Sequence, residues 1–349
     1  MNSKRFIKLS LSLTLILLIL VASLQIAIDP LFQYHKPWFG LKPIITNERY
    51  QNAGVEKNFD YDNVIIGNSL SENFRVSDVS EAFGGDTVKI TASGSHPLDW
   101  SYFLDVLKKR KNTPQNILIN MDPYIFNGSP TELKHDLPVY LYDDNYFNDV
   151  KYLFNFSAFN DFTFDSINKN KSNKIPDYDS FMLWDDKFEY GHDFVLEHYK
   201  RSEMSNDTPD IEGYIDNIQS NLDLLLPYIK LMKDTKFVFF FSPFSMVFWD
   251  NQMRQKSVEM QKAGYLKTCE ILTGYDNVTM YLWTDQEMLD IMADLDNYVD
   301  EAHYSPEVCR VMTKRIGKKE GILTKESYQQ KIKEMFDYIE SYDYNLLFE

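Results

Sequence analysis

The sequence predicts a doubly wound, three-layer α/β fold with a central parallel sheet, preceded by one transmembrane helix. Three observations support this prediction. Five short apolar runs, each followed by a turn signal, alternate with longer segments of helical periodicity. The runs are continuously apolar, as is typical of strands buried on both faces. The chain also opens with a basic cluster followed by a long uncharged apolar stretch.

The expected strands are rich in β-branched and aromatic residues. They lie at 63–66, 87–91, 116–121, 236–241 and 278–282. Helices are expected at 98–109, 210–233, 253–273, 305–317 and 326–342. This alternation of strand and helix predicts crossover connections, and therefore strands that run parallel in one sheet.

The N-terminal segment predicts a membrane anchor. Leu9 to Ile28 carries no charge, and at 1.5 Å per residue a helix of that length spans a hydrocarbon core of ~30 Å. Basic residues lie before this run, so the positive-inside rule places residues 1–8 in the cytoplasm and the chain after Asp29 outside. A cleaved signal peptide, with Val21 to Ser23 as its cleavage site, is the alternative. The length of the apolar run favours the uncleaved anchor.

The remaining chain predicts a short strap and one large domain. Residues 29–60 are punctuated by proline and aromatic residues, which favours an ordered juxtamembrane strap. Residues 61–349 contain all the expected strands and are assigned to the α/β domain. Within it, periodicity is lost at about 124–207, where Tyr, Phe, Asn and Asp dominate, so this stretch is expected to be an insertion.

Charge and cysteine content exclude several classes of protein. A formal net charge of −16 argues against a nucleic-acid partner, because phosphate binding needs a basic face. Cys269 and Cys309 have no metal-ligand spacing; they are either free, which the sequence favours, or paired in one disulfide. No metal site and no cofactor are expected.

Three residues predict serine chemistry. Ser69 directly follows the first strand, at the edge of the sheet where ligands of such folds bind, and Asp300 and His303 lie three residues apart near the C-terminus. A serine is a weak nucleophile until a base removes its proton, and that base needs an acid to orient it. The alternatives are that Ser69 caps a helix, that Ser71 is the nucleophile, and that His303 is a surface histidine.

These residues resemble the sequence blocks of SGNH/GDSL hydrolases. The stretch Gly67-Asn68-Ser69 is similar to the family's GDS block, and Asp300-x-x-His303 is similar to its final DxxH block. The resemblance implies a flavodoxin-like fold with Ser69 as nucleophile, His303 as general base and Asp300 as its orienting partner. It also implies an oxyanion hole formed by the backbone N–H groups of Ser69 and Gly94.

One block departs from the family, and several segments resemble its membrane-anchored members. Asp122 stands where the family carries an asparagine that donates to the oxyanion, so that donor is either absent or replaced. The anchored members are DltD-like cell-envelope proteins, encoded with membrane-bound O-acyltransferases (MBOAT). The similar segments lie at 29–37, 48–52, 137–142 and 298–305.

Further residues are candidates for the pocket. Asn68 and Asp122 lie in the matched blocks. His96 either lines the pocket or is a solvated loop histidine, and the sequence favours the second. Phe248 and Trp249, after the fourth strand, either form a platform for stacking a sugar or belong to the core.

The resemblance and the residues together predict an extracytoplasmic serine esterase or O-acyltransferase. Its substrate would be acyl groups, acetyl foremost, on a cell-envelope polysaccharide or a teichoic-acid-like polymer, with an MBOAT acyltransferase as partner. The sequence does not choose between hydrolase and transferase. A non-catalytic accessory protein that binds a polymer or an MBOAT partner is the first alternative, and a lipase-like enzyme is the second.

Overall fold

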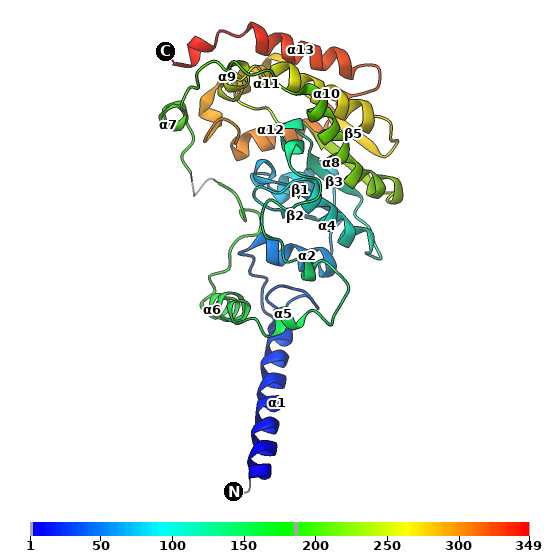
Figure 1. Cartoon of the computed structure of the whole chain (residues 1–349), viewed down its shortest axis with the longest axis vertical. Coiled ribbons are helices and arrows are strands. Elements are labelled where there is room, and N and C mark those ends of the chain that lie inside the picture. Colours follow the sequence, from blue (N-terminus) through cyan, green and yellow to red (C-terminus); the bar gives the residue numbers. More distant parts are fainter. Residues whose placement is uncertain (1–2, 185–187, 349) are drawn as a thin grey trace. The chain divides into compact units, whose positions relative to one another are not determined.

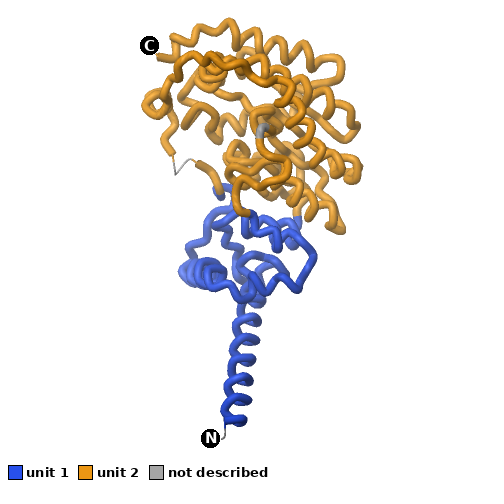
Figure 2. The backbone as a smooth tube through the Cα atoms, viewed as in Figure 1, with its two compact units in different colours: residues 1–60, 137–181 blue, residues 61–136, 182–349 orange. Residues whose placement is uncertain are grey.

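The computed structural model describes residues 3–184 and 188–348 and divides the chain into two compact units (Figure 2). Unit 1 consists of residues 1–60 and 137–181, and unit 2 consists of residues 61–136 and 182–349. Each unit therefore combines two stretches that are distant in the sequence. The segment expected to be an insertion is divided between the units, since 137–181 belongs to unit 1 and its flanks belong to unit 2.

Unit 2 is built on a six-stranded sheet with the order β2-β1-β3-β4-β5-β6. The strands are β1 (Asn63–Gly67), β2 (Thr87–Thr91), β3 (Asn116–Asn120), β4 (Lys236–Phe240), β5 (Val278–Tyr281) and β6 (Ile322–Leu323). The first five are parallel, which confirms the predicted sheet, while β6 pairs antiparallel with β5. The strand order reverses between β1 and β3, which is the switch point where such folds bind ligands.

Helices flank this sheet (Figure 1). In unit 2 they are α3 (Val76–Phe83), α4 (Pro97–Lys108), α7 (His192–His198), α8 (Ile211–Leu231), α9 (Met246–Arg254), α10 (Val258–Leu272), α11 (Gln286–Ala293), α12 (Pro306–Gly317) and α13 (Tyr328–Ser341). One group contains α3 and α12, and the other contains α4, α8 and α10, which pack on one another. The helix expected at 253–273 is wrong at its start, because the chain turns at Lys256, with φ of 55°, between α9 and α10.

The core of unit 2 explains the continuous apolarity of the strands. Val64, Ile65 and Ile66 of β1 are fully buried, as expected when helices cover both faces of the sheet. Burying each such side chain contributes about 1.5–3 kcal/mol before the cost of ordering it. Cys269 and Cys309 are both buried, and neither forms a disulfide within the part of the chain that the structure describes.

Unit 1 is organised around the last turn of the N-terminal helix. It contains α1 (Ser3–Ile28), α2 (Glu48–Asn58), α5 (Val150–Leu153), the π-helical turn η4 (Ala158–Phe164) and α6 (Asp165–Ser172). By length and composition α1 can cross a membrane or serve as a signal sequence, with a mean hydropathy of 2.6. The strap after it is ordered by the buried Asp29, whose carboxylate accepts the backbone N–H groups of Gln33, Tyr34 and His35.

Candidate active site

The position of Ser69 follows from a tight turn at the end of β1. Residues Ser69–Ser71 form a 3₁₀ turn, and the side chain of Asn68 accepts the Leu70 N–H at 3.0 Å. Gly67 is required there, because a Cβ at this position would lie 2.2 Å from the Ser71 Oγ. The turn therefore holds Ser69 directly at the carboxyl end of the strand next to the switch point.

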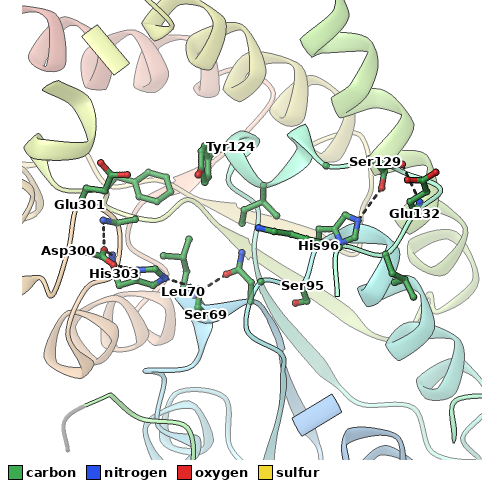
Figure 3. Close-up of a pocket in the computed structure, with 18 residues that line it drawn as sticks. Ser69, Leu70, Ser95, His96, Tyr124, Ser129, Glu132, Asp300, Glu301 and His303 are labelled. Carbon is green, nitrogen blue, oxygen red and sulfur yellow. Dashed lines mark hydrogen bonds and ion pairs between the residues drawn. The ribbon is translucent and has the colours of Figure 1, made fainter. Parts of the chain in front are cut away.

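Ser69, His303 and Asp300 form a connected triad (Figure 3). The Ser69 Oγ lies 2.8 Å from the His303 Nε2, and the His303 Nδ1 lies 2.7 Å from the Asp300 Oδ2. The other carboxylate oxygen of Asp300 accepts the backbone N–H groups of Ala302 and His303, both at 2.8 Å. The carboxylate thus fixes a proton on Nδ1, which leaves Nε2 as an acceptor facing the hydroxyl.

The environment of Asp300 keeps its carboxylate ionised. Burial by itself raises the pKa of this group, but the hydrogen bond and charge of His303, with the two backbone N–H groups, outweigh burial and lower the pKa below its ordinary value. An ionised Asp300 is the form that orients the imidazole and stabilises it once it is protonated.

Trp184 stacks on the imidazole of His303. The ring centroids are 4.4 Å apart, with an angle of 28° between the planes. The indole is itself held, since its Nε1 donates to Glu72 at 2.8 Å and its backbone N–H donates to Asn73 at 2.9 Å. Sequence reasoning had no signal for this contact, because a lone tryptophan in an irregular segment does not reveal its partner.

Three hydrogen-bond donors line the cavity beside Ser69. Within the described residues, the backbone N–H groups of Ser69 and Gly94 donate to no protein acceptor. Gly94 has φ of 69°, and a Cβ there would lie 2.6 Å from the His135 ring, so the position favours glycine. The Oδ1 of Asn68 accepts from Leu70, which fixes the orientation of the amide and leaves its NH₂ group as the third donor.

Asp122 and Ser71 are structural residues, contrary to two of the interpretations considered. Asp122 is fully buried and does not line the cavity. Its carboxylate accepts the Ser242 N–H at 2.7 Å and the Ser242 hydroxyl at 2.6 Å, which joins the ends of β3 and β4. Burial raises its pKa to about 6 despite these bonds. The Ser71 hydroxyl is buried and donates to Asn120 at 2.9 Å, so it is not exposed as a nucleophile.

The triad opens on a cavity of about 660 Å³. Its polar lining comes from the loops after β1, β2 and β3 and from residues 300–303. The lining residues are Asn68, Ser69, Ser95, His96, Tyr124, Ser129, Glu132, Lys134, Asp300, Glu301 and His303. Burial raises the pKa of Glu301, and the neighbouring Asp300 carboxylate adds to this effect. Both acidic and basic groups therefore reach the space in front of Ser69.

His96 lines this cavity, so the favoured interpretation as a solvated loop histidine is wrong. Only 4% of the residue is exposed. Its Nδ1 lies 2.6 Å from Asp99, and its Nε2 lies 3.1 Å from the Ser129 carbonyl oxygen (Figure 3). The signal was present as the spacing of His96 and Asp99 at the start of a helix.

Of the two alternatives for Phe248 and Trp249, the core is confirmed and the sugar-stacking platform is wrong. Both side chains lie in α9 and are almost fully buried, with 2% and 1% exposed, because α9 begins earlier than expected and turns them into the core. Tyr124 lines the cavity instead, with 52% of the residue exposed. Its ring meets those of Phe244 and Phe248 edge to face, so Phe248 supports the aromatic surface from behind.

Comparisons with known proteins do not identify the function of the chain. No family model and no curated protein matches the chain. A solved structure from Streptococcus pneumonia, described provisionally as a platelet activating factor, is similar with a TM-score of 0.38 and 10% sequence identity. The similarity covers 84% of this chain and 91% of that one. A likeness of this degree carries no argument about the function.

Proposed function

We propose that this chain is a serine esterase or O-acyltransferase in which Ser69 carries the acyl group. The observation that carries the proposal is the continuous contact from Ser69 through His303 to Asp300 at the wall of a cavity. A hydroxyl, a base and an orienting carboxylate in this order are the groups that nucleophilic acyl transfer requires.

The reaction divides into two steps. In the first, the Ser69 Oγ attacks the ester carbonyl while its proton passes to the His303 Nε2, and the same proton then goes to the leaving alcohol. In the second, an acceptor hydroxyl gives its proton to Nε2 and attacks the acyl-enzyme; the bond between the acyl carbon and the Ser69 Oγ then breaks, and Nε2 returns the proton to Oγ, which restores both Ser69 and His303. Water as the acceptor makes the chain an esterase, and a sugar hydroxyl makes it a transferase.

The three donors beside Ser69 support stabilisation of the tetrahedral intermediate. The backbone N–H groups of Ser69 and Gly94 would receive the oxyanion, and the Asn68 amide would replace the asparagine donor that resembling hydrolases carry after the third strand. Because Asp122 is turned away into the core, its carboxylate would not oppose the developing negative charge.

Other residues that line the cavity support a carbohydrate substrate. The exposed ring of Tyr124 offers an apolar face for a sugar, and Glu301 and Glu132 offer acceptors for its hydroxyl groups. We therefore assign the substrate as an acylated, foremost acetylated, cell-envelope polysaccharide or teichoic-acid-like polymer. With α1 as an uncleaved anchor, unit 2 would act outside the cytoplasmic membrane, and the resemblance adds an MBOAT acyltransferase as partner.

A fluorophosphonate probe applied to membranes that carry the full chain tests the nucleophile. The parent is expected to be labelled and Ser69→Ala is expected to lose the label. Ser71→Ala, which alters the neighbouring buried hydroxyl, serves as the matched control and should keep it. An unlabelled parent would refute the proposal in favour of a non-catalytic accessory protein. Acetate release with and without added polysaccharide then separates hydrolysis from transfer.

A further inference from the structure

The exposed part of α1 is shorter than a bilayer core is thick. From Leu9 to Leu24 its leucine and isoleucine side chains are 39–65% exposed, whereas Gln25 is fully buried in unit 1. At 1.5 Å per residue this exposed stretch is about 24 Å long, against a hydrocarbon core of ~30 Å. If α1 crosses a membrane, the hydrocarbon core of the bilayer must extend to Leu24 to cover the exposed apolar side chains of the helix. The surface of unit 1 next to Gln25 then meets the lipid headgroups.

Trp38 is fixed beside this boundary. The ring of His35 is bonded through Nε2 to the carbonyl oxygen of Ile26 in the last turn of α1, at 2.7 Å. Trp38 stacks on that same ring, with centroids 3.6 Å apart and planes 3° from parallel. Half of Trp38 is nevertheless exposed, and Phe39, packed edge to face against it, is 78% exposed.

A second set of exposed aromatic residues lies on the elements that pack against α1. Both α5 and η4 contact α1, and the Thr163 hydroxyl in η4 donates to the buried Gln25 at 2.6 Å. Phe164 follows Thr163 and is 46% exposed. Phe154 and Phe156 lie between α5 and η4 and are 45% and 82% exposed.

We propose that these five side chains, here called the aromatic collar, insert into the headgroup region of the membrane that α1 enters. The collar comprises Trp38, Phe39, Phe154, Phe156 and Phe164. Tryptophan concentrates at membrane–water interfaces, where its ring is covered and its polar edge stays hydrated. Phenylalanine is typical of the apolar face of segments that lie at the boundary between headgroups and acyl chains. The segments that carry the collar contact the last turns of α1, so the lipid that covers α1 would also lie close to these rings.

The distribution of exposed apolar side chains supports lipid as the occupant. Outside α1, the described part of unit 1 carries nine large hydrophobic residues that are exposed, and seven of them are aromatic. The described part of unit 2, although it is much the longer, carries eight, and they are scattered along its sequence. A soluble surface does not explain this concentration in the unit that holds α1.

Tryptophan quenching in nanodiscs tests the collar without reference to activity. The full chain is compared in plain phosphatidylcholine and in phosphatidylcholine brominated on acyl carbons close to the headgroup. The brominated lipid should quench part of the emission, and Trp38→Phe should lose that part. Trp283→Phe, which removes a buried tryptophan of unit 2, is the matched control and should keep it. Equal emission from the parent in both lipids would overturn the proposal and assign the collar to a protein partner.

A gain of signal tests whether the collar acts as one surface. In the Trp38→Phe chain, Phe156→Trp should restore quenching by the brominated lipid, because residue 156 is expected at the same depth. Quenching that is lost with Trp38 and not restored at residue 156 would limit lipid contact to the strap, which contradicts a collar.

Discussion

Two histidine–aspartate pairs line the same cavity, and only one of them is placed to act as a base. In both pairs the residues are three apart, and Nδ1 meets a carboxylate at 2.7 Å in His303–Asp300 and at 2.6 Å in His96–Asp99. The second nitrogen differs. In His303 it faces the Ser69 hydroxyl, and in His96 it faces the carbonyl oxygen of Ser129.

The partner of the second nitrogen decides what each ring can do. A carboxylate and a carbonyl only accept hydrogen bonds, so the two partners of His96 favour a proton on each ring nitrogen and leave neither nitrogen free to act as a base. Burial alone would lower the pKa of His96, but Asp99 and the Ser129 carbonyl outweigh it and raise the pKa. A hydroxyl can donate, so His303 can accept. A His–Asp pair is therefore catalytic only through its third partner.

The largest expected effect is on the acylation rate, and it should appear only when the His303–Asp300 pair is changed. In Asp300→Asn the amide favours the wrong tautomer of His303, so acylation by p-nitrophenyl acetate should slow by up to ~10⁴ while the fold is kept. Burst-phase kinetics on the full chain in detergent, with circular dichroism as the control for folding, measure this. Acylation within about tenfold of the parent would contradict the role of Asp300.

The second effect concerns stability. Asp99→Asn leaves a buried cation without its counter-charge, and breaking such a pair costs about 3–5 kcal/mol. Urea unfolding should show this loss, whereas the burst rate per titrated active site should stay near that of the parent. A slow burst in a chain that remains folded would make His96–Asp99 part of the catalytic machinery and would break the comparison.

A third variant tests the hydrogen-bond donor of Asn68 beside Ser69. The ring of His96 faces a carbonyl oxygen where that of His303 faces this nucleophile. Asn68→Asp keeps the oxygen that accepts the Leu70 N–H and removes the donor that faces the cavity. Losing one oxyanion donor should by itself lower kcat by about 10²–10³, and the new carboxylate would add to the loss because it repels the oxyanion. Asn68→Ala, which loses both functions, should also lower the urea midpoint. If Asn68→Asp reacts as fast as the parent, two backbone donors suffice.

The pH dependence of stability tests whether His96 is charged in the folded protein. Because the folded pKa of His96 lies above its unfolded value of about 6.5, its stabilising contribution is complete below that pH and is lost as pH rises through the folded pKa. Urea midpoints of the parent should therefore fall as pH rises above about 6.5, and His96→Gln should remove that part of the slope. An identical slope in both chains would contradict a charged His96.

The smallest expected effect belongs to the stacked indole. Aromatic pairs contribute about 0.5–1.5 kcal/mol beyond their buried area, so Trp184→Ala should lower kcat about two- to tenfold. Trp184→Phe, which keeps a ring against His303, should recover most of the rate. Equal losses in both variants would point to the hydrogen bond with Glu72 instead of the stack.

The sequence predicted the parts that depend on local pattern. The five parallel strands were evident because apolar runs buried on both faces need no partner to be recognised. β6 was missed because a two-residue edge strand has no periodicity, and the start of the helix expected at 253–273 was wrong because periodicity continued across the break between α9 and α10. The two sequence blocks predicted Ser69 and His303 as a pair, and their side chains lie 2.8 Å apart, but the stacking of Trp184 depends on a long-range contact that no local pattern encodes.

The interleaving of the two units sets an order for folding during synthesis. Unit 1 needs residues 137–181 to complete it, yet residues 61–136, which form β1, β2 and β3, leave the ribosome first. The first half of unit 1 must therefore wait, with α1 already made, while strands of the other unit emerge. Asp29 stays without its Tyr152 hydrogen bond until that second segment arrives. A cut in the chain at any single boundary between the units would separate the two segments of at least one unit.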